Sequence, residues 1–311
     1  MHIPGTDLFY HNGHALTMKS AVISCKYFFK KYSAIIVLAF LFGCNKQKPL
    51  DILQAPGVQS PYSLLPKGIN LSAHSKGFYE YLPEGYSSSS ANTKFPMIIF
   101  FHGGGEIGND STQLYNILKN GPLKHVTAGT FPTSFIVNSK TYKFIIIAPQ
   151  FTTLDNSYPD EVDNIIEYAK QNYKVDVSRI YLTGLSVGAG QAWNYVGKNS
   201  NYARKIAAIV PIGSYINETR DEFKITNGKA QIIAASNMPI WATHNNGDDI
   251  CPLSWDVNAL DLIKSSNPAL RPQPKLTVFN AWGHEGWTQT YDPNFKENNM
   301  NIYEWMLQYH R

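Results

Sequence analysis

Short, continuously apolar segments alternate with helix-like patterns along most of this 311-residue chain. Residues 97–101 (MIIFF) and 144–148 (FIIIA) are apolar at every position, which is typical of strands buried on both faces of a sheet. Residues 159–169 place apolar side chains three and four positions apart, which predicts a helix with one buried face. Strands alternating with helices predict the α/β class, with a mostly parallel central sheet covered by helices on both faces.

The same patterns define the individual elements. The predicted strands cover residues 78–82, 97–101, 144–148, 180–183, 207–210, 240–243 and 276–279. The predicted helices cover residues 159–169, 189–196, 230–235 and 301–310. The long segment 214–238 between two strands is expected to form a small lid that contains the third of these helices.

A glycine-flanked serine follows one of these strands directly. Residues 184–188 read Gly-Leu-Ser-Val-Gly and lie between the strand at 180–183 and the helix at 189–196. In this context the motif predicts a nucleophile elbow, a turn so tight that residues flanking the serine must be small. A glycine-rich helix start is the alternative, because the motif alone is common. The strand–turn–helix placement favours Ser186 as a nucleophile.

Two later strand ends supply partners for that serine. The strand at 240–243 leads to Asp248 and Asp249, and the strand at 276–279 leads to His284. The order serine, acid, histidine is the order of hydrolases with a nucleophile elbow. Asp248 is favoured over Asp249 by its spacing from the strand end, although both stay open. We therefore predict a Ser186–His284–Asp248 triad, and we expect His244 to be structural.

A glycine run after another strand predicts an oxyanion hole. Residues 102–106 read His-Gly-Gly-Gly-Glu, and glycines allow backbone N–H groups to approach a ligand closely. We expect the N–H of Val187 and one N–H from Gly104 or Gly105 to bind the oxyanion. A glycine-rich strand exit without function is the alternative.

Three further side chains are weaker candidates for contacts with substrate. Gln150 ends a predicted strand, and Trp287 and Tyr291 follow His284 closely. A loop-forming role for Gln150 and a packing role for the two aromatic side chains are the alternatives.

These motifs resemble the esterase D and carbohydrate esterase family one group, which includes feruloyl esterases and polyhydroxybutyrate-depolymerase-like enzymes. The resemblance rests on residues 102–110 (HGGGEIGND), 177–186 (VSRIYLTGLS) and 284–291 (HEGWTQTY). The chain departs from the family at His244-Asn245, where His-Gly is usual, and at residues 188–190, where a Gly-Gly doublet is usual. The resemblance implies an α/β-hydrolase fold and an extracytoplasmic esterase acting on acyl or feruloyl esters of polysaccharide.

The N-terminal region has the pattern of an export signal. Two lysines precede an apolar run at residues 34–42, and Gly43 and Cys44 follow it. This order predicts a signal peptide over residues 1–44 that ends in a lipobox, with Cys44 lipidated and the protein anchored to a bacterial membrane. Met18 is an alternative start, and an ordinary signal peptide is the alternative interpretation. Residues 45–66 are predicted to be a linker and residues 67–311 the catalytic domain.

The charge distribution and the spacing of histidines and cysteines argue against two classes of function. The net charge of +4 arises almost entirely in the N-terminal region, so the remainder lacks the basic stripe that nucleic-acid binding requires. No histidine or cysteine cluster has zinc spacing, so no metal or other cofactor is expected.

The leading prediction is a serine carboxylic-ester hydrolase that forms an acyl-enzyme. The alternatives are a serine peptidase related to prolyl oligopeptidase and a non-catalytic surface-binding lipoprotein.

Overall fold

The computed structural model describes residues 61–311 except 154, 156–157, 218 and 220–221. The predicted signal peptide, Cys44 and most of the predicted linker therefore lie outside the described residues. Among the helices of the described part, none is long and apolar enough to cross a membrane.

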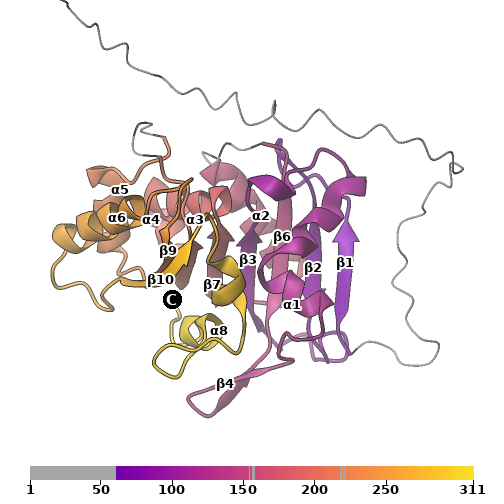
Figure 1. Cartoon of the computed structure of the whole chain (residues 1–311). Helices are drawn as coiled ribbons and strands as arrows, with labels where there is room; N and C mark the ends of the chain where they lie inside the picture. Colours follow the sequence, from indigo (N-terminus) through magenta and orange to yellow (C-terminus); the bar gives the residue numbers. More distant parts are fainter. Residues whose placement is uncertain (1–60, 154, 156–157, 218, 220–221) are drawn as a thin grey trace, which may run out of the picture. The chain divides into compact units, whose positions relative to one another are not determined.

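One mixed sheet of eight strands organises the described part of the chain (Figure 1). The strand order is β1-β2-β6-β3-β7-β8-β9-β10. Strand β2 is antiparallel to both of its neighbours, and every pairing from β6 to β10 is parallel. The strands are β1 (Ser63–Lys67), β2 (Ser75–Leu82), β3 (Phe95–Phe101), β6 (Ile145–Phe151), β7 (Val175–Leu185), β8 (Ala208–Ile212), β9 (Trp241–Gly247) and β10 (Lys275–Trp282).

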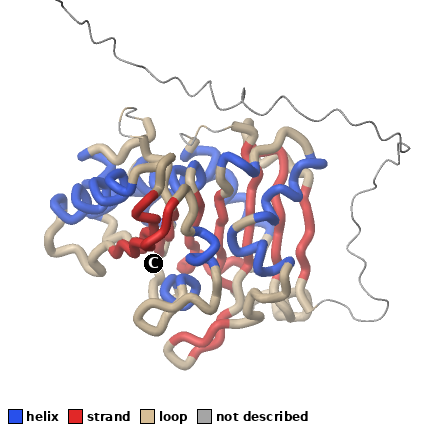
Figure 2. Tube along the Cα trace, in the orientation of Figure 1, coloured by secondary structure: helices blue, strands red, loops and turns tan. Residues whose placement is uncertain are grey.

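Alternating side chains of the central strands build one core on each face of the sheet. Ile99 and Phe101 of β3 belong to one buried cluster, whereas Ile98 and Phe100 belong to the other. Helices cover both clusters (Figure 2), which confirms the predicted α/β class. The first cluster includes residues of α2 (Pro159–Asn172), α3 (Val187–Lys198), α4 (Ser200–Lys205), α5 (Asn227–Ala235) and α6 (Leu253–Ser266). The second includes residues of η3 (Ser111–Lys119), α1 (Gly121–Thr127), α7 (Trp287–Tyr291) and α8 (Ile302–Met306).

The first strand of the sheet corrects a predicted boundary. Residues 63–66 were expected to belong to the linker, but they form most of β1, which pairs with β2 along its whole length. Strand β1 is an edge strand, and Leu65 and Pro66 are exposed. An edge strand that contains proline and exposes its apolar residues has no alternating pattern to reveal it. The hairpin of β4 (Phe135–Val137) and β5 (Lys140–Tyr142) was also not predicted, because strands of three residues are too short to show an alternating pattern.

The helix inside the segment expected to be a lid belongs to the core instead. Its helix α5 buries Ala230, Ile233 and Ala234 in the first core cluster. These small and branched side chains pack beside α3 and α6, so α5 is one of the helices that cover the sheet. The predicted helix at 301–310 is also shorter than expected, because α8 ends at Met306.

Candidate active site

The carboxyl ends of four parallel strands bring the predicted site residues to one edge of the sheet. Strand β3 leads to the glycine loop, β7 to Ser186, β9 to Asp248 and β10 to His284. Parallel strands place their carboxyl ends together, so loops that are far apart in the sequence meet there.

The backbone of Ser186 has the strained conformation of a nucleophile elbow. Its φ of 55° and ψ of −119° lie in a region that residues other than glycine rarely adopt. The surrounding strands hold it there: its N–H donates to the carbonyl of Ile212 (2.9 Å), and its carbonyl accepts from the N–H of Tyr215 (3.0 Å). The hydroxyl is therefore presented at the start of α3.

The glycines of the motif are required by close approach of the backbone. A Cβ at Gly188 would lie 2.2 Å from the carbonyl oxygen of Phe101 and 2.5 Å from that of His102. A Cβ at Gly184 would lie 2.5 Å from the backbone of Gly188. The elbow is thus packed directly against the end of β3, which brings the serine next to the glycine loop.

We expect Gly188→Ala to destabilise the fold because its new methyl group meets backbone atoms that cannot rotate away. Overpacking of this kind costs about 2–3 kcal/mol of unfolding free energy. For a domain of this size, the melting temperature falls by about 5–10 °C. Thermal unfolding followed by circular dichroism measures the change. Gly68→Ala is the control, because no atom lies within 4 Å of its Cβ position, and equal melting temperatures for both variants would contradict the expectation.

The three predicted triad side chains form one continuous chain of hydrogen bonds. His284 Nε2 lies 2.8 Å from Ser186 Oγ, and His284 Nδ1 lies 2.7 Å from Asp248 Oδ2. The Asp248 side chain is fully buried, whereas that of His284 is 16% exposed. This geometry suits an imidazole that accepts the serine proton while a fixed carboxylate holds its other nitrogen.

Local backbone geometry selects Asp248 from the two adjacent aspartates. Its Oδ1 accepts the N–H groups of Ile250 (3.0 Å) and Cys251 (2.8 Å), which turns the side chain inward. Asp249 is exposed. Burial favours the protonated form of Asp248, but hydrogen bonds from His244, His284 and the two N–H groups outweigh it. The pKa of Asp248 therefore lies well below its usual range.

The predicted oxyanion residues meet around a small cavity beside the serine. Gly104 and Val187 both line it, whereas Gly105 is exposed and does not. Val187 is the first residue of α3, where backbone N–H groups lack intrahelical acceptors. The arrangement favours Gly104 over Gly105 as the second donor. Gln191, which sequence reasoning missed, also lines the cavity, and its Oε1 is buried without a hydrogen-bond partner among the described residues.

A neutral histidine holds the glycine loop in place. The N–H of Phe151 donates to His102 Nε2 (2.8 Å), so the proton of the ring lies on Nδ1, which donates to the carbonyl of Gly103 (2.7 Å). Burial lowers the pKa of His102, in agreement with a neutral ring. This residue ties the loop to β6.

Contacts of the weaker candidates favour packing for two of them. Gln150 is buried and donates its amide to the carbonyls of Glu106 and Gln113, both at 2.8 Å, so it supports the glycine loop and does not face a substrate. Tyr291 is buried and shares a hydrogen bond of 2.9 Å with Thr183. Trp287 is half-buried and lies edge-on to His284, with ring centroids 5.2 Å apart, so it remains a candidate.

The thiol of Cys251 also lies near the triad. Its Sγ is 3.9 Å from His284 Nε2, and the residue is fully buried. Burial, with Asp248 and Asp256 nearby, raises the pKa of Cys251, so the group stays a neutral thiol. A neutral, buried thiol is a poor nucleophile, which makes Ser186 the better candidate nucleophile beside His284.

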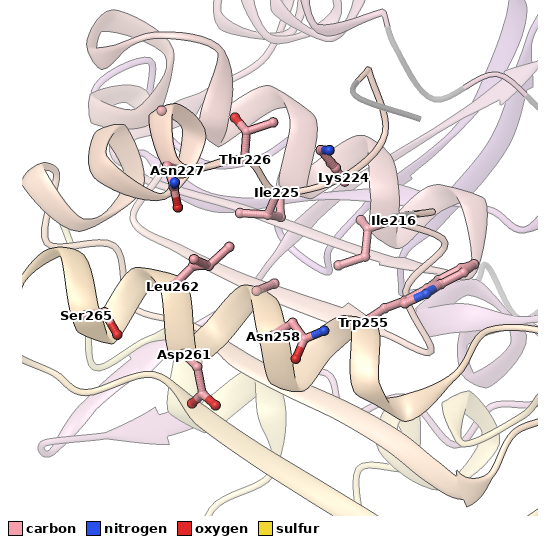
Figure 3. Close-up of a pocket in the computed structure, with 12 residues that line it drawn as sticks. Ile216, Lys224, Ile225, Thr226, Asn227, Trp255, Asn258, Asp261, Leu262 and Ser265 are labelled. Atoms are coloured by element: carbon pink, nitrogen blue, oxygen red, sulfur yellow. The ribbon is translucent and has the colours of Figure 1, made fainter. Parts of the chain in front are cut away.

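A larger groove lies between α5 and α6 (Figure 3). It has a volume of about 790 Å³, and its walls include Ile225, Trp255 and Leu262. None of the three triad residues lines it. The groove is therefore a feature separate from the serine.

Comparison with known proteins identifies the fold. No protein-family model and no curated protein matches the chain. A crystal structure of a thermostable esterase superposes with a TM-score of 0.53 and 17% identity, over 81% of this chain and 63% of that one. This chain thus spans less than two thirds of that esterase.

Two further solved structures are similar. A ferulic acid esterase gives a TM-score of 0.48 at 13% identity, over 73% of this chain and 92% of that one. The S-formylglutathione hydrolase FrmB from Staphylococcus aureus gives 0.49 at 12% identity, over 72% and 89%. The first superposition, together with the antiparallel second strand and the elbow after β7, shows that the chain has the α/β-hydrolase fold.

Proposed function

We propose that this protein is a serine carboxylic-ester hydrolase that acts through an acyl-enzyme. The observation that carries the proposal is the unbroken hydrogen-bonded chain from Asp248 through His284 to Ser186. This chain ends beside a cavity lined by Gly104 and Val187, whose N–H groups are the proposed oxyanion donors. A nucleophile, a base, an acid that orients the base and an oxyanion site are the parts that acyl transfer requires.

The reaction follows from the positions of these groups. His284 Nε2 takes the proton of Ser186 as the hydroxyl oxygen attacks the ester carbonyl, and the resulting oxyanion accepts the backbone N–H groups. The imidazolium then gives its proton to the departing alcohol, which leaves an acyl-serine. Water, deprotonated by His284, attacks the acyl-serine and releases the acid and the free serine. Asp248 stays ionised throughout and stabilises the imidazolium.

The proposed substrates are acyl or feruloyl esters of polysaccharide. The family resemblance of the sequence supports this class, and so does the place of Trp287. An aromatic ring edge-on to the catalytic imidazole offers an apolar wall beside the scissile bond, which suits an aromatic acyl group.

The direct test is hydrolysis of p-nitrophenyl acetate, methyl ferulate and p-nitroacetanilide by the full chain. We expect turnover of both esters and little turnover of the anilide. A faster reaction with the anilide would instead support the peptidase alternative. Absence of all turnover, together with no labelling by a fluorophosphonate, would support the non-catalytic alternative.

We further propose that the protein is exported and anchored to a membrane by lipid on Cys44. The lysines, apolar run and Gly43-Cys44 of the N-terminal region support this proposal. In a bacterial host, Cys44→Ser is expected to move the protein from the membrane fraction to the soluble fraction. Cys25→Ser, which alters a cysteine inside the proposed signal peptide, is the control and should leave the distribution unchanged. Unchanged membrane association of Cys44→Ser would refute the anchor.

A further inference from the structure

A buried ion pair lies directly behind the triad. His244 on β9 and Asp256 on α6 are both fully buried, and His244 Nδ1 lies 2.7 Å from Asp256 Oδ2. The other ring nitrogen, Nε2, lies 2.8 Å from the carbonyl oxygen of Cys251 and 3.3 Å from Asp248 Oδ2. The same carboxylate oxygen of Asp248 therefore faces His284 on one side and His244 on the other.

The hydrogen-bond partners of His244 determine its protonation state. With Asp248 and Asp256 ionised, both ring nitrogens face oxygen atoms that only accept hydrogen bonds, namely two carboxylates and a carbonyl. A neutral ring would turn one lone pair toward such an oxygen, so both nitrogens must carry protons. Burial alone lowers the pKa of His244, but the hydrogen bonds to Asp248 and Asp256 raise it to about 10. His244 is therefore a cation at neutral pH, unlike His102, whose ring accepts a backbone N–H.

This cation separates two buried carboxylates. Asp256 has no solvent exposure, and its Oδ1 has no hydrogen-bond partner among the described residues. Its Oδ2 meets His244 and, at 3.4 Å, the N–H of Ser214. A buried carboxylate with so few donors is costly unless a cation pairs with it. Without the imidazolium, the negative charges of Asp248 and Asp256 would repel each other.

Among the described residues, the charged and titratable groups in direct contact with His244 come from the loop after β9 and from α6. The loop after β9 contributes Asp248 and the neutral thiol of Cys251, and α6 contributes Asp256. His284 lies beyond Asp248. The cation thus acts on the triad through Asp248.

We propose, on the basis of the esterase function proposed above, that His244 and Asp256 are positioning residues that extend the triad to five members. In the sequence Asp256–His244–Asp248–His284–Ser186, the His244 cation fixes Asp248 Oδ2 from the side opposite His284. It keeps that carboxylate ionised, so that Asp248 accepts a hydrogen bond from the Nδ1–H of His284. Asp256 holds the cation in place and compensates its charge.

His244→Gln tests the proposal because it keeps a donor but removes the charge. We expect kcat for p-nitrophenyl acetate to fall by about 10- to 100-fold, with KM within about twofold. A nearby positive charge disfavours proton binding by the Asp248–His284 pair. Its removal lets the pair bind a proton at higher pH, so the acid limb of the kcat/KM profile should move to higher pH.

Three further variants separate this role from a structural one. Asp256→Asn should also lower kcat, and the double variant should lose no more than His244→Gln alone, because both residues act through one cation. Asp256→Asn alone also provides the test if His244→Gln fails to fold. Glu80→Gln removes a buried carboxylate that pairs with Lys67 (3.0 Å) away from the triad, and it should leave kcat and the pH profile unchanged.

The outcomes distinguish the two proposals. If the wild-type chain shows no turnover that depends on Ser186, the esterase function is wrong. If Ser186-dependent turnover is present but His244→Gln keeps the wild-type kcat and acid limb, only the five-member chain is wrong. Multiplicative losses in the double variant would also overturn it.

Discussion

Replacing Ser186 with alanine is expected to lower kcat by on the order of 10⁴–10⁶-fold while the fold is retained. The hydroxyl is the group that would form the acyl bond, and no other nucleophile replaces it, because the nearby Cys251 is a buried, neutral thiol. The residual rate would come from the oxyanion donors and from substrate binding. Initial rates with p-nitrophenyl acetate measure the loss.

The fold of Ser186→Ala should be unaffected for a local reason. Alanine removes only the Oγ atom, and the backbone bonds to Ile212 and Tyr215 that hold the elbow do not involve the side chain. The control is Ser254→Ala, which removes an exposed hydroxyl at the start of α6 and should keep full activity. A correctly folded Ser186→Ala protein with wild-type turnover would remove the nucleophile assignment.

Asp248→Asn is expected to lower kcat by on the order of 10⁴-fold. An asparagine has nearly the same shape but carries no charge, so it no longer stabilises the imidazolium of His284. It also permits the wrong tautomer of that ring, because its amide can donate to Nδ1. The loss of kcat should appear with methyl ferulate as well as with p-nitrophenyl acetate. Every ester requires a correctly oriented His284, whatever its acyl group.

Asp249→Asn is the matched control for that variant. The two aspartates are adjacent, but Asp249 is exposed, whereas the Asp248 side chain is buried against His284 and His244. We expect Asp249→Asn to keep turnover within about twofold, as surface changes usually do. If the losses were reversed, Asp249 would be the acid, and the described loop would not be the catalytic conformation.

The elements that sequence patterns predicted best are those whose signal is local. Strands β3 and β6 are apolar at nearly every position because the sheet buries both of their faces. Ser186 was recognisable because the tight turn after β7 excludes a Cβ at Gly184 and Gly188. Such steric requirements appear in the sequence as a motif of a few consecutive residues.

Other features had no local signal. Strand β1 lies at the edge of the sheet with exposed Leu65 and Pro66, so its pairing with β2 left no alternating pattern. The segment expected to form a lid contributes α5 to the sheet-covering layer, which depends on packing against α3 and α6. Gln150 ends a strand as a substrate-binding residue would, yet its partners are two loop carbonyls.

Hydrophobic periodicity and small flanking residues act over consecutive positions, so the amino-acid order alone predicted the α/β class, the elbow serine and the candidate histidine. Which of Asp248 and Asp249 lies against His284 depends on the tertiary structure, since the turn that binds Asp248 Oδ1 points that side chain inward. The contact between Asp256 on α6 and His244 on β9 likewise depends on the tertiary structure. Hydrogen bonds and charges act between groups close in space, and their neighbours are set by how the strands and helices pack.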